Sequence, residues 1–184
     1  MSTWQLDQAH SAVEFSARHM MVSTVRGRFD RFTVDLEADE QAPERARVVA
    51  RIDAASVDTG QEQRDGHLRS ADFFDVEHHP EIVFQSTSVK RIAGNEFEVA
   101  GDLTIRGETR PLVLRTEFQG IVRNLQGGRS AGFSADAKIN RTDWGLTWNV
   151  ALESGGWLVA DEIKVHVELE VVEAAQTATG IGAA

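Results

Sequence analysis

Hydrophobic and polar residues alternate with a period of two along most of this chain. The most regular stretch is residues 163–171, where apolar residues fill the odd positions and polar or charged residues the even ones. The same alternation recurs at residues 13–17, 32–37, 48–53, 97–105, 112–118 and 131–139. A strand with one apolar and one polar face is typical of antiparallel sheet, so the pattern predicts an all-β fold.

Short polar or glycine-containing breaks separate the alternating stretches, as hairpin turns do. They fall at residues 39–43, 93–95, 106–108 and 127–128. Gln61–Ser70 is polar and lacks the period of two, which indicates a short helix or ordered loop with Leu68 turned inward. Residues 174–184 are small and polar, so we expect one β domain over residues 1–173 and a C-terminal tail outside it.

At least eight strands can close either as a β-sandwich or as an up-and-down β-barrel. Consecutive short hairpins favour the barrel, because Greek-key sandwiches need longer crossover connections. The sequence therefore predicts an extended antiparallel up-and-down β-barrel with one short helical excursion.

The side chains on the expected inward face differ strongly in size. Ala17, Ala50 and Ala135 are small, whereas Phe15 and Phe84 are large. Such a mixture fits a packed core of interdigitating side chains, and it fits equally a barrel that keeps room for one slim ligand.

Several polar and aromatic residues are candidates for ligand contact. His19 shares its face of the strand with the apolar residues of 13–17, so it either meets a polar group of a ligand or is an interior histidine satisfied by the protein. Arg26 and Arg28 either attract an anionic head group or lie on a solvated face. Three tryptophans either plug the core or line the mouth of a ligand site: Trp144, Trp148 and Trp157.

The charge of the chain excludes several functions. Nineteen Lys and Arg residues against 29 Asp and Glu residues give a net charge of −10, which argues against binding to nucleic acid or to anionic lipid surfaces.

No cysteine is present, so thiolate chemistry and disulfides are excluded. The sequence contains no run of about 18 apolar residues, so we expect no integral membrane segment. The N-terminus lacks the pattern of a signal peptide, so we expect a cytoplasmic protein.

Motifs for catalysis or metal binding are also missing from the sequence. His78 and His79 are adjacent, and neighbours in an extended chain point to opposite sides, so they cannot simply share one ion. The sequence has no HExxH and no glycine-rich phosphate loop. We therefore expect no metal site and no catalytic residues.

Six stretches of the chain resemble, in order, blocks of the YceI-like proteins. They lie at residues 4–19, 52–60, 64–75, 80–86, 101–111 and 140–146. The most specific is Arg64–Asp75, which reads RDGHLRSADFFD. The resemblance extends from about residue 4 to 172 and covers nearly the whole chain.

The resemblance implies a lipocalin-like barrel whose apolar tunnel holds an isoprenoid quinone, a polyprenyl phosphate or a similar lipid, with no other cofactor. It places His19 near the head group and gives Arg64, Asp65 and His67 a structural role. Carried over residue by residue, it implies a tunnel lined by Val13, Phe15, Ala17, His19, Phe32, Val34, Leu36, Ile52, Phe84, Leu103, Phe133, Ala135 and Trp144.

Two functions remain open from the sequence. The first is the carriage, storage or sequestration of a long-chain isoprenoid lipid, which needs only a dry tunnel. The second is an enzyme acting on such a lipid, which needs polar groups that converge on a reactive carbon. Many YceI-like proteins carry a secretion signal, which this sequence does not show. Formation of a homodimer also stays open from the sequence.

Overall fold

One antiparallel β-sheet contains every strand in the computed structural model, which describes residues 1–125 and 127–174. The strands are β1 (Ser2–Leu6), β2 (Ala12–His19), β3 (Ser23–Phe29), β4 (Phe32–Ala38), β5 (Arg47–Asp53), β6 (Val57–Asp58), β7 (Glu81–Ala93), β8 (Glu96–Ile105), β9 (Glu108–Arg123), β10 (Arg129–Asn140) and β11 (Val159–Glu173). The helix α1 (Glu62–Arg69) lies between β6 and β7. Short 3₁₀ helices span Gln8–His10, Pro43–Arg45, Ala54–Ser56 and Arg141–Trp144.

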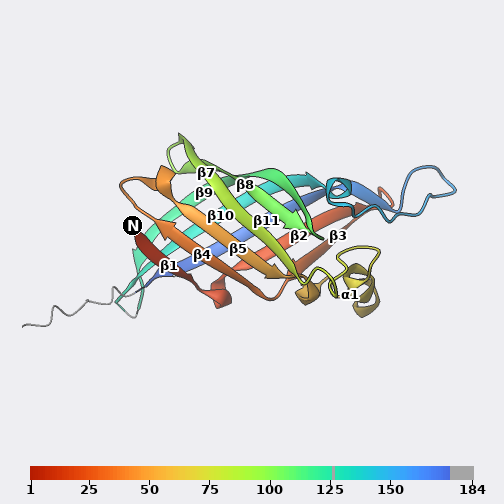
Figure 1. Ribbon diagram of the computed structural model, residues 1–184, viewed down its shortest axis with the longest axis horizontal. Coiled ribbons are helices and arrows are strands. Elements are labelled where there is room, and N and C mark those ends of the chain that lie inside the picture. The colour runs from red at the N-terminus through yellow and green to blue at the C-terminus, as the bar shows by residue number, and fades with distance from the viewer. Residues whose placement is uncertain (126, 175–184) are drawn as a thin grey trace, which may run out of the picture.

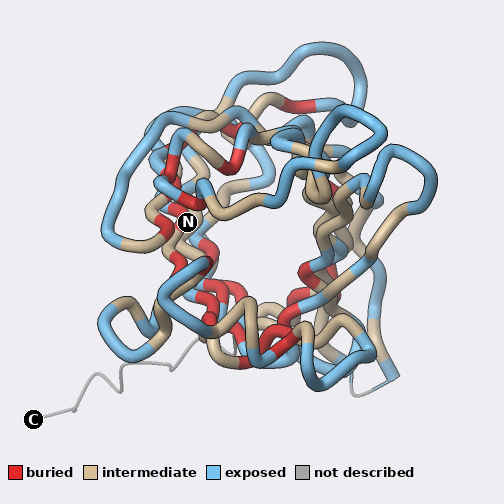
Figure 2. Tube along the Cα trace, turned by 90° about the vertical axis from the view of Figure 1, so that its right-hand side faces the viewer, coloured by how far each residue is buried: buried red, intermediate tan, exposed pale blue. Residues whose placement is uncertain are grey.

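The sheet closes on itself, which confirms the predicted barrel and excludes the sandwich. Eight strands form the ring in the order β1-β4-β5-β7-β8-β9-β10-β11, and β11 pairs with β1 to close it. Strands β2, β3 and β6 extend the sheet from β11. Figure 1 shows the elongated barrel from the side, and Figure 2 shows the chain running round the ring.

The two ends of the barrel are called the His19 end and the Glu173 end. At the His19 end, β2 and β10 finish, and β11 begins beside them. At the Glu173 end, β1 and β10 begin and β11 finishes. The His19 end, with α1 and the segment 145–158, lies on the right in Figure 1, and the Glu173 end lies on the left.

The predicted alternation is confirmed by the burial and register of the strands. In β4, residues 32, 34 and 36 are buried and the residues between them are exposed. One row of directly opposed inward residues crosses four strands from Val34 through Ala50 and Phe84 to Leu103. Directly opposed residues share a face of the sheet, so a single period-two pattern in each strand produces one continuous apolar interior.

The helical excursion predicted at Gln61–Ser70 is confirmed, one residue shorter at each end. Asp65 is buried and accepts hydrogen bonds from the backbone N (2.9 Å) and the Oγ1 (2.5 Å) of Thr59. Arg64 donates to the Oγ1 (2.7 Å) and carbonyl oxygen (2.9 Å) of Thr59. These bonds tie α1 to the chain segment before it, in agreement with the structural role expected for Arg64 and Asp65.

An ion cluster joins four segments at the Glu173 end. Arg129 donates to both carboxylate oxygens of Glu173, at 2.6 and 2.7 Å, and also contacts Glu40. Ser2 donates to Glu173 at 2.8 Å. Beyond it, the backbone N of Ala174 donates to Thr3, so the first residue of the expected tail is still bonded to β1, whereas residues 175–184 lie outside the described part of the chain.

The pH dependence of stability should report this cluster. Its hydrogen bonds from Arg129 and Ser2 lower the pKa of Glu173 from 4.5 to about 2. A carboxylate with a lowered folded-state pKa stabilises the fold above its unfolded pKa and loses that effect as pH falls through the folded one. The difference in unfolding free energy between the wild type and Glu173→Gln should therefore be largest above pH 4.5 and shrink toward pH 2. Chemical unfolding at a series of pH values measures it, with exposed Glu37→Gln as the control. A difference that stays constant over this range would contradict the prediction.

Gly101 should be required for the packing of Phe84. A Cβ atom at Gly101 would lie 2.5 Å from Cζ of Phe84 and 2.5 Å from the carbonyl oxygen of Gln85. Gly101→Ala should cost about 1–3 kcal/mol of unfolding free energy, because the ring and the neighbouring strand must move. Gly66→Ala in α1 meets nothing within 4 Å and should gain about 0.5–1 kcal/mol. Urea unfolding of both variants measures the contrast, and equal stabilities would refute it.

Candidate functional site: an apolar cavity inside the barrel

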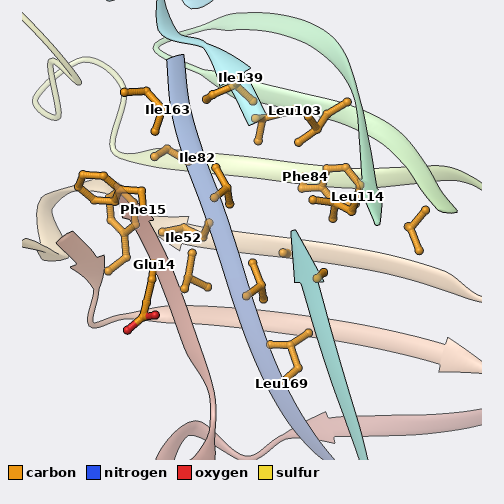
Figure 3. A pocket seen from close by; sticks show the side chains of 18 of the residues that line it. Glu14, Phe15, Ile52, Ile82, Phe84, Leu103, Leu114, Ile139, Ile163 and Leu169 are labelled. Atoms are coloured by element: carbon orange, nitrogen blue, oxygen red, sulfur yellow. The ribbon is translucent and has the colours of Figure 1, made fainter. Parts of the chain in front are cut away.

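A cavity of about 620 Å³ runs through the interior of the barrel. Its middle is walled by aliphatic and aromatic side chains from strands all round the ring. Figure 3 shows side chains such as Ile52, Phe84, Leu103 and Leu169 converging from different strands. The interior is therefore hollow, and the alternative of a fully packed core does not describe it.

The structure places eleven of the thirteen residues expected at the tunnel on the cavity wall. They are Val13, Phe15, Ala17, His19, Val34, Leu36, Ile52, Phe84, Leu103, Phe133 and Ala135. Phe32 and Trp144 are buried but do not line the cavity. Trp144 lies in the 3₁₀ helix after β10, and its Nε1 donates to the carbonyl oxygen of Leu103 at 2.9 Å. Trp144 therefore lies outside the cavity wall, and its indole N–H fixes the 3₁₀ helix to the backbone of β8.

The largest wall residue in β2 leaves the cavity open because it lies against a glycine. Phe15 is directly opposed to Gly27 across the β2–β3 pair. A Cβ atom at Gly27 would come within 2.4 Å of the Phe15 ring, so the ring occupies the space that a side chain on β3 would take. Small wall residues such as Ala50 and Ala135 keep further space free. The mixture of large and small inward residues thus produces a hollow interior.

Polar side chains of the wall lie mainly toward the two ends of the barrel. His19 is the last residue of β2, is partly exposed, and lines the cavity at one end. Arg91, Asp39 and Glu40 line it at the other end. Glu14 is exposed on β2 and is the one labelled residue in Figure 3 with polar side-chain atoms. The arrangement can bury a long apolar chain in the middle and meet polar groups at either end.

His67 brings α1 to the cavity, a position that the sequence interpretation did not assign to it. Its Nε2 lies 2.8 Å from the carboxylate of Asp72. Its ring packs edge-to-face on Trp148, with centroids 4.5 Å apart, and on Phe73 at 5.1 Å. His67, Leu68 and Trp148 all line the cavity, so the helix and the segment 145–158 both border it at this end. The lack of alternation at Gln61–Ser70 predicted the helix with Leu68 turned inward, but it gave no signal that His67 would reach the cavity.

Arg141 holds the segment 145–158, which borders the cavity at the His19 end. Its side chain is 4% exposed and donates to the carbonyl oxygens of Leu146 (2.5 Å), Trp148 (3.0 Å) and Ala160 (3.1 Å). It also forms a 3.3 Å ion pair with Asp161. Burial lowers the pKa of this guanidinium. The buried guanidinium of Arg141 thus fixes a loop that lacks regular secondary structure. In the sequence, only the family resemblance of residues 140–146 drew attention to this arginine.

The adjacent histidines are held by different surroundings. Nδ1 of His78 lies 2.9 Å from the carboxylate of Asp75, which raises the pKa of His78. The ring of His79 lies instead against Gly107. The absence of a metal site stays a prediction.

Within residues 1–125 and 127–174, no helix is long and apolar enough to cross a membrane.

Comparison with known proteins agrees with the barrel and its cavity. The sequence profile of the YceI-like domain matches residues 4–171. A UPF0312 protein of Staphylococcus epidermidis is 37% identical over 171 residues, which are 92% of this chain and 97% of that protein. A UPF0312 protein of Staphylococcus aureus matches with the same identity and coverage.

Three solved structures share the fold. The YceI protein of Campylobacter jejuni is 28% identical with a TM-score of 0.74, covering 86% of this chain and 90% of its own. BcnA of Burkholderia cenocepacia has a TM-score of 0.77 at 23% identity, covering 90% of this chain and 98% of its own. A polyisoprenoid binding domain from Saccharophagus degradans has a TM-score of 0.69 at 15% identity, covering 95% and 100%. The profile match and the staphylococcal relatives show that this chain belongs to the YceI-like family.

Proposed function

We propose that this protein binds a long-chain isoprenoid lipid, such as an isoprenoid quinone or a polyprenyl phosphate, inside the barrel. The observation that carries the proposal is the cavity of about 620 Å³ with its apolar middle. Burial of apolar surface contributes about 25 cal/mol per Å², so a long hydrocarbon can bind with few polar contacts. The fold shared with a polyisoprenoid binding domain supports the same ligand class.

Binding without turnover fits the cavity better than catalysis does. An enzyme acting on the lipid would need an acid, base or nucleophile aimed at a reactive carbon. Within the described residues, the cavity wall presents its histidines, His19 and His67, at one end, and His67 is already engaged by Asp72. We therefore propose that the protein carries, stores or sequesters its lipid.

Blocking the middle of the cavity should abolish lipid uptake. Ala135 lies on the wall in β10, and Ala135→Trp would fill the space beside it. Overpacking of this kind costs about 1–3 kcal/mol, so circular dichroism should first show that the variant is folded. Lys138→Trp, on the exposed face of the same strand, is the matched control.

The uptake experiment uses prenyl alcohols of increasing chain length. For the wild type and Lys138→Trp, affinity should rise with length until the cavity is full, while Ala135→Trp should bind none of the long chains. Extraction with organic solvent and mass spectrometry measure the bound lipid. Equal affinity for short and long chains, or normal uptake by folded Ala135→Trp, would show that the cavity is not the site.

His19 is proposed to contact the polar end of the lipid. Replacing it by Phe keeps an aromatic ring but removes both ring nitrogens. Affinity for a prenyl phosphate should fall about two- to tenfold, the value of one hydrogen bond of about 0.5–1.5 kcal/mol, while affinity for the matching hydrocarbon barely changes. His166→Phe, on the outer wall beside Asp136, is the control. Equal losses for both ligands, measured by tryptophan fluorescence titration, would reject the contact.

A further inference from the structure

Five large hydrophobic side chains are exposed together at the His19 end and are called the apolar tip. Met21, Val22 and Trp157 are 72%, 78% and 58% exposed. Met20 and Val150 are 43% and 45% exposed. They are half of the ten exposed large hydrophobics found in the described part of the chain, yet they come from only two short segments. Contiguous exposed apolar groups of this kind mark sites of interaction.

The two segments of the apolar tip are held side by side. The backbone N of Met20 donates to the carbonyl oxygen of Leu158 at 2.8 Å. The Sδ atom of Met21 lies 3.5 Å from where a Cβ of Gly156 would be, so its side chain covers the backbone of the second segment. The backbone N of Leu158 donates to Val150 at 2.9 Å. In Figure 1 the segment 145–158 projects beyond the strands of the barrel.

The β2–β3 turn has a sequence that is unfavourable for its own backbone. The backbone N of Val22 donates to the carbonyl oxygen of His19 at 3.1 Å, and the two residues between have positive φ angles of 50° at Met20 and 60° at Met21. A β-turn with both central φ angles positive is normally built from Asn and Gly. Two methionines there carry a conformational cost and remain exposed. Strain at an exposed turn is a feature of interaction sites, because packing inside the protein does not explain it.

The charge around the tip also differs from that of the rest of the molecule. The segment 145–158 contains one charged residue, Glu153, in a chain with a net charge of −10. At the base of the tip, the guanidinium of Arg18 donates to the carbonyl oxygen of Met21 at 2.8 Å and to Oγ1 of Thr24 at 3.1 Å. An apolar projection with a tryptophan and a basic residue at its base suits the boundary between lipid head groups and hydrocarbon.

Residues next to the apolar tip belong to the cavity wall. His19 precedes Met20, Leu158 follows Trp157, and both His19 and Leu158 line the cavity wall. A surface that joins the apolar tip to the cavity would let a hydrocarbon chain pass between a bilayer and the barrel without crossing water.

We propose that the apolar tip inserts into the surface of a lipid bilayer and that the cavity is loaded and emptied at this end. The loading route rests on the proposed lipid-binding function, whereas the insertion rests on the tip alone. A bilayer fits better than a second copy of the chain, because a stable protein interface buries about 800 Å² on each partner and a few projecting side chains do not supply it. The net charge of −10 favours neutral, zwitterionic lipid.

Flotation with phosphatidylcholine vesicles tests the insertion. The wild type should float with the vesicles, and Val22→Asp should partition about tenfold more weakly, because a charge then replaces an inserted apolar side chain. Val122→Asp is the matched control, since Val122 is 65% exposed and lies at the opposite end of the barrel. Failure of the wild type to float, or equal losses in both variants, would overturn the proposal.

A second variant separates insertion from folding. Met20→Asn combined with Met21→Gly supplies the residues that the turn favours, so it should raise the stability of the protein. The same variant should float at least about fivefold more weakly, because it removes two inserted side chains. Unfolding in urea measures the first effect and flotation the second. Normal flotation of this variant would contradict the role of the methionines.

Two further measurements separate this proposal from the proposed function. Folded Ala135→Trp should float like the wild type although its cavity is blocked, whereas Val22→Asp should still bind a prenyl alcohol added directly but exchange it with vesicles more slowly. If the wild type takes up no prenyl alcohol but still floats with vesicles, the lipid-binding function is rejected and membrane insertion is retained. Sedimentation that shows a dimer broken by Val22→Asp, without vesicle binding, would assign the tip to a second copy and overturn the insertion.

Discussion

Closure of the sheet through β11 is the constraint on which the rest of the structure depends. This strand pairs with β10 along one edge, and along the other it pairs with β1 near its end and with β2 near its beginning. Without these pairings the sheet would have two open edges, and its apolar face would have no interior to enclose. Arg129, Glu173 and Ser2 reinforce the closure at one end with charge-assisted hydrogen bonds.

Once the ring is closed, the side chains on its inner face decide whether the interior is filled. An eight-stranded barrel is only just wide enough to hold a slim ligand, so a few residues determine the outcome. Phe15 lies over Gly27, and Phe84 fills the space that a side chain at Gly101 would take, which keeps both rings near the wall. Ala50 and Ala135 add space between them. The cavity thus results from the glycines and alanines at these positions of the inner face.

The two ends of the barrel are built in different ways, and this asymmetry gives the cavity a direction. One end carries the cluster of Arg129 with Glu40 and Glu173. At the other end lie α1 and the segment that Arg141 holds through the carbonyl oxygens of Leu146 and Trp148, and this end carries the exposed methionines and Trp157. A charged, cross-linked end and an apolar, projecting end provide different environments for entry of a lipid.

The period-two pattern by itself determined the strands, their inward faces and the all-β class, because one side chain in two must leave water wherever a strand covers a core. It also placed His19 on the inner face, since parity in β2 is not interrupted. It could not place Arg141, Trp144 or His67, because the first two lie in a 3₁₀ helix and the third in α1, where a period of two does not apply. Only the tertiary structure decided that the barrel is hollow and that the two segments of the apolar tip lie side by side at one end of the cavity, because both depend on contacts between residues far apart in the chain, which local alternation does not encode.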